Sequence, residues 1–113
     1  MQSKPTKTFD INLNKKFVKI PNKLAYVYVN NLKSFQGSNL FSRYDCYGTY
    51  VVYSFGWHFP ILACVNGKWF KHLTKGSNTT SRHLNQICLN LTNITNIENI
   101  TKFENFLANG GKL

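Results

Sequence analysis

The segment GSNTTSRHLNQICLNL, residues 76–91, combines a run of hydrogen-bond donors with the spacing of an amphipathic helix. Apolar residues recur at the i, i+3, i+4, i+7 positions of one helix face: Leu84, Ile87, Cys88 and Leu91. Donor side chains crowd the turn before them: Thr79, Thr80, Ser81, Arg82 and His83. A single hydroxyl is enough to cap a helix, so this cluster exceeds what capping requires.

These donors predict an anion-binding site at the start of the helix. The first backbone N–H groups of a helix lack internal partners, and the helix dipole adds a partial positive charge there. A phosphate can accept hydrogen bonds from those groups, from the hydroxyls and from the guanidinium of Arg82, while Gly76 would let the backbone come close. Three lysines complete the predicted anion-binding set: Lys68, Lys71 and Lys75. The alternative is ordinary capping by Thr79 or Thr80, with Arg82 and His83 directed to water.

The three histidines, His58, His72 and His83, raise the possibility of catalysis. Two histidines and a lysine can hydrolyse RNA by general acid–base chemistry, because an unperturbed imidazole titrates near neutral pH. Nothing in the spacing brings these residues together, so we predict no catalytic residue and no enzyme. A histidine-dependent ribonuclease stays as an alternative.

Aromatic residues alternate with cations along the predicted strands. Aromatic rings beside positive charges hold single-stranded nucleic acid, because bases stack on the rings and the cations follow the phosphates. We predict four stacking or lining residues: Tyr50, Tyr53, His58 and Trp69. Only the sheet face that is not used for the core could bind in this way, and the sequence does not say which face that is.

Metal and cofactor chemistry has little support in the sequence. The cysteines, Cys46, Cys64 and Cys88, form no C-x-x-C pair, and the histidines form no close pair, so we predict no metal site and no cofactor. An odd number of cysteines without a signal peptide indicates reduced thiols and a cytoplasmic location in a bacterial host. No apolar run approaches the roughly 18 residues of a membrane-spanning helix, so we expect no membrane association.

Charge is the strongest bulk property of the chain. Fourteen Lys and Arg residues oppose four Asp and Glu residues in 113 residues, which gives a formal net charge of +10. Such an excess predicts attraction to polyanions: nucleic acid, phosphorylated ligands or an acidic protein surface. An apolar fraction of 42% is enough for a real core, so this is not the composition of a disordered chain.

The pattern along the chain predicts strands followed by helices. Residues 1–23 carry six lysines and are predicted to form a basic arm with a short edge strand near Phe17 and Ile20. Residues 24–31 are rich in β-branched and aromatic side chains and predict a strand, whereas residues 32–45 predict a packed loop. The clearest strand is 46–55, in which Tyr50 and Val52 should face one side and Tyr53 the other.

Two further strands and two helices complete the prediction. Strands 58–65 and 68–72 should form a hairpin through Asn66-Gly67, which favours a type I′ turn, and Pro60 should lie at a strand start or edge. Helices are expected over 80–91 and after Thr95, where Glu98 would complete a capping box. We therefore predict a single α+β domain over residues 24–113. Its antiparallel sheet of about four to five strands should pack on two C-terminal helices.

Three motifs resemble a small family of uncharacterised proteins carried by bacteriophages and plasmids. The motifs are YVVYSFGWHFP (50–60), KWF (68–70) and TTSRHLNQ (79–86), so the similarity covers about a third of the chain. This chain departs from the pattern at Gly76, where an aromatic residue is expected, and at Trp57, which replaces a smaller residue. The matched positions are Tyr50, Tyr53, His58, Phe59, Pro60, Trp69, Thr79, Thr80, Ser81, Arg82, His83 and Gln86. The resemblance implies a mobile-element setting but no established activity.

These observations favour a non-enzymatic accessory protein that binds a phosphate-rich partner, either nucleic acid or a host nucleoprotein complex. By analogy of size and charge, its use would be counter-defence, for example as an anti-CRISPR inhibitor. Two alternatives use other chemistry: a protein that sequesters a signalling nucleotide, and the ribonuclease described above. A purely protein-directed inhibitor would need only an acidic partner surface. The sequence leaves the partner and the oligomeric state open.

Overall fold

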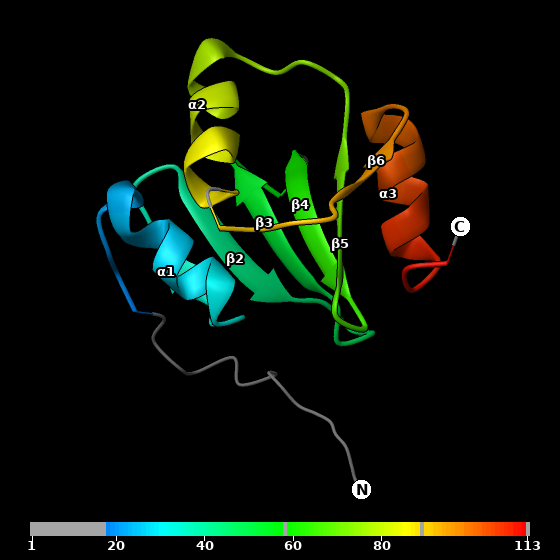
Figure 1. The fold of residues 1–113 in the computed structure, drawn as a ribbon, viewed down its shortest axis with the longest axis horizontal. Helices are drawn as coiled ribbons and strands as arrows, with labels where there is room; N and C mark the ends of the chain where they lie inside the picture. The colour runs from blue at the N-terminus through cyan, green and yellow to red at the C-terminus, as the bar shows by residue number, and fades with distance from the viewer. Residues whose placement is uncertain (1–17, 58, 89, 113) are drawn as a thin grey trace, which may run out of the picture.

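Alternating side chains build a mixed sheet whose six strands follow the chain order β1-β2-β3-β4-β5-β6 (Figure 1). The computed structural model describes residues 18–57, 59–88 and 90–112. The strands are β1 (Phe35–Gln36), β2 (Leu40–Tyr44), β3 (Tyr50–Ser54), β4 (Pro60–Val65), β5 (Lys68–His72) and β6 (Thr95–Ile97). Neighbouring strands are antiparallel except for β6, which pairs in parallel with β5. The α+β prediction is confirmed, with more strands than predicted.

The centre of the sheet follows the sequence prediction closely. Tyr50 and Val52 pack in one hydrophobic cluster, and Val51 and Tyr53 pack in the other, as the alternation of β3 predicts. The β4–β5 turn has φ angles of 51° at Asn66 and 81° at Gly67, the left-handed pair that a type I′ turn requires. Pro60 begins β4, next to a register irregularity opposite β3. A proline at this position interrupts no central ladder.

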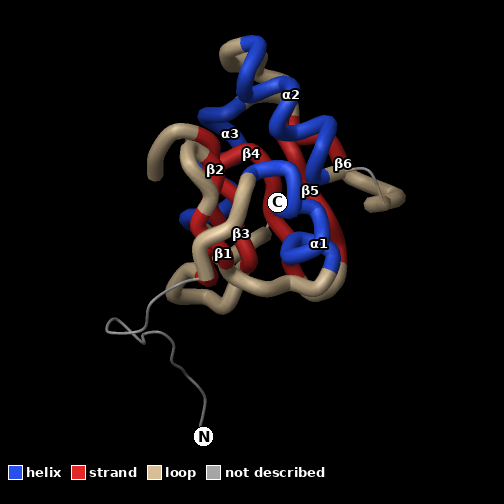
Figure 2. Tube along the Cα trace, turned by 90° about the vertical axis from the view of Figure 1, so that its left-hand side faces the viewer, coloured by secondary structure: helices blue, strands red, loops and turns tan. Residues whose placement is uncertain are grey.

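Helices cover both faces of the sheet. The cluster of Tyr50 and Val52 includes Ala25 from α1 (Ala25–Asn30) and Ile87 from α2 (Asn78–Ile87). The opposite cluster includes Phe103 from α3 (Ile100–Ala108). The turned view shows α1 and α2 on one side of the strands and α3 on the other (Figure 2). The sequence predicts neither α1 nor the division of the helices between two faces.

The predicted strand over residues 24–31 is wrong, because this segment forms α1 after a short 3-10 turn, Asn22–Leu24. Ala25 and Val29 are fully buried four residues apart, whereas Val27 is 41% exposed. A strand would have buried all three on one face, so the burial has the period of a helix. Packing on the sheet therefore overrides the β-propensity of the side chains.

The predicted loop over residues 32–45 is also wrong, because it contains β1 and β2. The polar residues Ser42 and Arg43 conceal the strand in the sequence. In the structure Ser42 is fully buried, and its hydroxyl accepts a hydrogen bond from the Phe35 N–H at 3.1 Å. The chain before α1 lies along β1, where Lys19 forms a parallel bridge to Gln36. Most of the predicted basic arm, residues 1–17 with Phe17, lies outside the described residues.

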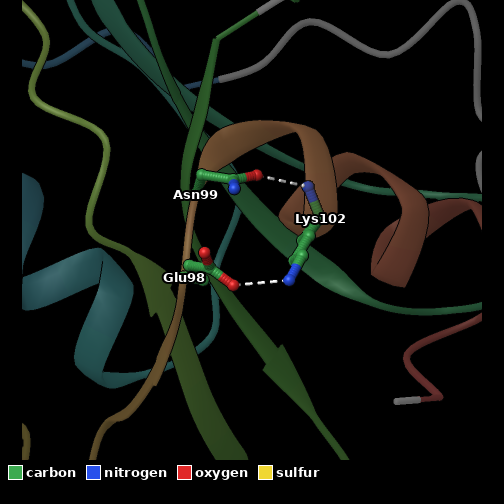
Figure 3. A network of polar contacts seen from close by, with 3 residues as sticks. All are labelled: Glu98, Asn99 and Lys102. Carbon is green, nitrogen blue, oxygen red and sulfur yellow. Dashed lines mark hydrogen bonds and ion pairs between the residues drawn. The ribbon is translucent and has the colours of Figure 1, made fainter.

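The C-terminal helix begins later than predicted. Thr95 belongs to β6 instead of capping a helix, and α3 is capped by Asn99, whose side chain accepts a hydrogen bond from the Lys102 N–H at 2.9 Å (Figure 3). Glu98 pairs with the Lys102 ammonium instead of closing a capping box (Figure 3). The helix ends at Ala108, shortly before the predicted stop at Gly110 and Gly111, both with positive φ. Within the described residues, no helix is long and apolar enough to cross a membrane.

Candidate functional site

The start of α2 is where the sequence predicts the anion site. Ser77 is the N-cap, and its hydroxyl accepts a hydrogen bond from the Thr80 N–H at 3.0 Å. The predicted helix start is therefore about two residues late, and the cap is neither Thr79 nor Thr80. The last residue of α2 is Ile87, so Leu91 packs against the core from the segment after the helix.

Two of the predicted donors point into the protein. Thr80 and His83 are 6% and 4% exposed and lie against Ser54 of β3, which is fully buried. The Ser54 hydroxyl is 3.0 Å from the Thr80 hydroxyl and 3.2 Å from Nδ1 of His83. Nε2 of His83 lies 3.4 Å from the amide nitrogen of Asn22. These buried hydrogen bonds connect α2 to the sheet. They use the atoms of Thr80 and His83 that were predicted to bind an anion.

His83 is held neutral in this group. Burial, assisted by the neighbouring positive charge of Arg82, lowers the pKa of His83 below its usual value. A neutral ring that accepts a hydrogen bond from Asn22 at Nε2 donates from Nδ1 to Ser54, which matches both contacts. His83 is therefore a structural residue that carries no charge for a phosphate near neutral pH.

Gly76 serves packing instead of anion approach. A Cβ atom at this position would lie 2.9 Å from the ring of Phe59 and 3.1 Å from Cβ of Thr80. The missing side chain lets the backbone before α2 pass over Phe59, which itself packs against the core. The absence of a side chain at Gly76 is therefore explained by the contact between this segment and Phe59, the residue just before β4.

The other predicted anion-binding residues remain accessible. Arg82 and Lys75 are exposed, and Thr79 and Ser81 are partly exposed at the same end of α2. Lys68 is exposed and Lys71 partly exposed, but both belong to β5. Thr79, Ser81 and Arg82 therefore lie close together on the first turns of α2, whereas the two lysines lie on the sheet.

The predicted aromatic residues divide between the two faces of the sheet. Tyr50 is 1% exposed, and its hydroxyl donates to the carbonyl of Lys33 at 2.8 Å, so its ring cannot stack on an outside base. Trp69 is partly buried and packs edge-on against Tyr50, on the side of α1 and α2. Tyr53 lies on the opposite face. His58 lies outside the described residues.

Tyr53 belongs to an aromatic cluster that the sequence did not reveal. Its ring stacks on Phe41 at 5.0 Å, and Trp57 contacts both rings at 4.9 and 5.0 Å. The guanidinium of Arg43 lies 5.2 Å from the centre of the Phe41 ring. We call Phe41, Arg43, Tyr53 and Trp57 the aromatic strip. The sequence contains no clear signal for it, because Ser42 and Arg43 interrupt the apolar pattern of β2 and the segment was predicted to be a loop.

No family model, curated protein or solved structure matches the chain. The similarity to phage and plasmid proteins therefore stays a prediction, and the site has to be judged on its geometry alone.

Other arrangements in the described residues offer less. His72 and His83 are both buried in separate hydrogen-bonded groups, since His72 contacts the carbonyl of Pro60 at 2.8 Å. No three His, Cys, Asp or Glu side chains among these residues are grouped to hold a metal ion. A cavity of about 290 Å³ lies at the other end of the sheet. It is lined by Tyr47, Gly48, Thr49, Val65, Asn66, Asn109, Gly110 and Lys112, none of which belongs to the predicted site.

The buried histidines should make the stability depend on pH. Burial lowers the pKa of both His72 and His83, whereas histidine in the unfolded chain titrates near pH 6.5. Below that pH the unfolded state binds more protons than the folded state. The free energy of unfolding should therefore be highest above about pH 6.5 and fall as the pH decreases through the lowered folded-state pKa values.

Urea unfolding at fixed ionic strength between about pH 5 and 8 measures this dependence. His83→Gln, which replaces the titrating ring by an amide, should flatten the profile. The charged groups that act on His72 are Glu104 and Lys71, and the one that acts on His83 is Arg82. An equally steep profile in His83→Gln would contradict the assigned role of His83.

Proposed function

We propose that this protein is a non-enzymatic binding protein for nucleic acid. The observation that carries the proposal is the cationic surface. Within the described residues, one ion pair neutralises one of these cations: Lys102 with Glu98. The exposed cations come from many parts of the chain, and all but Lys102 have no carboxylate partner among the described residues: Lys19, Lys23, Lys33, Lys68, Lys75, Arg82, Lys102 and Lys112. Charges that lack carboxylate partners attract polyanions and release the counterions of a nucleic acid when they bind it.

An extended polyanion fits this distribution better than a small nucleotide does. The cations lie on the sheet, on α2, on α3 and in turns, so no single cavity collects them. The cavity near Tyr47 contains one cation, Lys112, and none of the predicted anion-binding residues. A polymer can contact separated charges at the same time, whereas a free nucleotide cannot. For biological use we propose interference with a host nucleic-acid complex, such as a CRISPR effector. This part rests on analogy of size and charge and on the mobile-element setting that the sequence resemblance implies.

Salt dependence tests the proposal. The affinity for fluorescein-labelled DNA and RNA should fall about tenfold or more between 50 and 200 mM salt, as expected for two or more phosphate contacts. Arg82→Gln should reduce the slope of log K against log salt by about one if Arg82 contacts a phosphate. Glu104→Gln, an exposed change of opposite charge on α3, is the control and should not reduce the slope.

A panel of free nucleotides belongs in the same experiment. Tight binding of one nucleotide with little salt dependence would contradict the proposal and favour sequestration of a signalling nucleotide. Absence of binding to DNA and RNA at low salt would also contradict it. Cleavage of RNA during the assay would contradict the non-enzymatic part alone.

A further inference from the structure

The aromatic strip lies on a part of the sheet that none of the helices in the described residues covers. On this face α3 packs mainly on β5 and β6, while the strip belongs to β2, β3 and the turn after β3. Trp57 remains 63% exposed, although its indole is among the largest apolar groups of the chain. Contacts with Phe41 and Tyr53 restrain the indole from one side, so its outer side is accessible. A ring that is already positioned loses little further entropy when a flat ligand stacks on it.

A cation is fixed in the strip beside these rings. The Arg43 guanidinium donates to the carbonyls of Phe35 and Ser42 at 2.9 and 2.7 Å, and to Oε1 of Gln36 at 2.8 Å. These hydrogen bonds hold the planar group at one edge of the strip, near the Phe41 ring. The exposed Lys19 pairs with Gln36 at the same edge of the sheet. Positive charge therefore borders the rings along one side.

We infer that the aromatic strip binds unpaired bases of a single-stranded nucleic acid, with a base stacked on Trp57 and the phosphates near Arg43 and Lys19. This inference rests on the proposed function. It adds the binding site and the preference for single-stranded over double-stranded nucleic acid. Stacking on an aromatic side chain requires a base that has left its own stack, which a duplex does not offer. The net charge of +10 favours an anionic polymer over a second copy of this chain, because two copies would repel each other.

Fluorescence anisotropy with labelled oligo(dT), oligo(U) and a duplex of equal length tests the inference. At equal salt the single strands should bind more tightly than the duplex. Trp57→Ala should weaken single-strand binding by about tenfold, as the loss of one stacked base predicts, while the salt dependence stays the same. Tyr47→Ala is the matched control, because Tyr47 is similarly exposed (60%) but lies in the turn at the opposite end of β3. Its affinity should stay within about twofold of the wild type.

A second measurement does not depend on the fold of an alanine variant. The chain has two tryptophans, so in Trp69→Phe the emission comes from Trp57 alone. Saturating oligo(dT) should quench this emission, because the base lies on the indole. Binding without quenching, equal losses in Trp57→Ala and Tyr47→Ala, or equal affinity for duplex would overturn the inference and leave nucleic-acid binding intact. Absence of binding to every nucleic acid would overturn the proposed function together with it.

Discussion

Phe103→Ala should lower the free energy of unfolding by about 3–5 kcal/mol, the range for removing a buried phenylalanine ring. The Phe103 side chain is fully buried in the layer between α3 and the sheet. Its ring centre lies 5.2 Å from that of His72 on β5 and 6.2 Å from that of Phe106. The neighbouring His72 and Phe106 are themselves buried, so we expect the surroundings to relax only in part and a cavity to remain.

Urea unfolding at pH 7.5, where the lowered pKa values of His72 and His83 keep both rings mainly neutral, measures this loss. Asn105→Ala on the same helix is the control, because Asn105 is exposed and should change stability by less than about 0.5 kcal/mol. Similar values for both variants would mean that α3 does not cover the sheet in the way described. The measurement therefore tests the placement of α3. In this placement α3 does not cover the aromatic strip.

Local chemistry made the central hairpin predictable. Asn66 and Gly67 favour the left-handed conformations of a type I′ turn, and this preference depends on two residues alone. The alternation of β3 likewise assigned Tyr50 and Tyr53 to opposite faces, as observed. These features follow from the period of a strand and from turn chemistry, so the sequence contains them locally.

The exposed face was not predictable in the same way. Tyr50 and Tyr53 have the same chemistry, and their different exposure depends on which helices cover each side of β3. Tyr50 is buried beneath α1, a helix whose valines and tyrosines predict a strand. Tyr53 is left near the edge of the α3 layer, and the position of α3 depends on Asn99 and the parallel strand β6. These contacts join residues far apart in sequence, so no local pattern reports them.

The surplus of donors at the start of α2 has the same origin. Capping of the helix requires one hydroxyl, and Ser77 supplies it. The hydroxyl of Thr80 and the ring of His83 are the hydrogen-bond partners of Ser54, a buried hydroxyl on β3. The helix sequence alone does not show that Ser54 requires these partners. Thr79, Ser81 and Arg82 remain accessible for a phosphate. The predicted anion site is thus reduced to the donors that face water.

Thr80→Val and Thr79→Val separate these two roles of the hydroxyls. Each change removes a hydroxyl from neighbouring positions of one helix turn and keeps the β-branched shape. Thr80→Val should lower the free energy of unfolding by about 1–3 kcal/mol, because it leaves the buried Ser54 hydroxyl with one partner fewer. Thr79→Val should change it by less than about 0.5 kcal/mol, since Thr79 is partly exposed.

Nucleic-acid affinity provides the second half of this comparison. Folded Thr80→Val should bind as the wild type does, because its hydroxyl faces the sheet and cannot reach an external phosphate. A loss of affinity in Thr79→Val together with unchanged stability would place a phosphate at the start of α2, in addition to the aromatic strip. Equal stability of the two variants would instead contradict the hydrogen bond between Thr80 and Ser54. The outcome then decides whether the donors of α2 hold the fold together or face the partner.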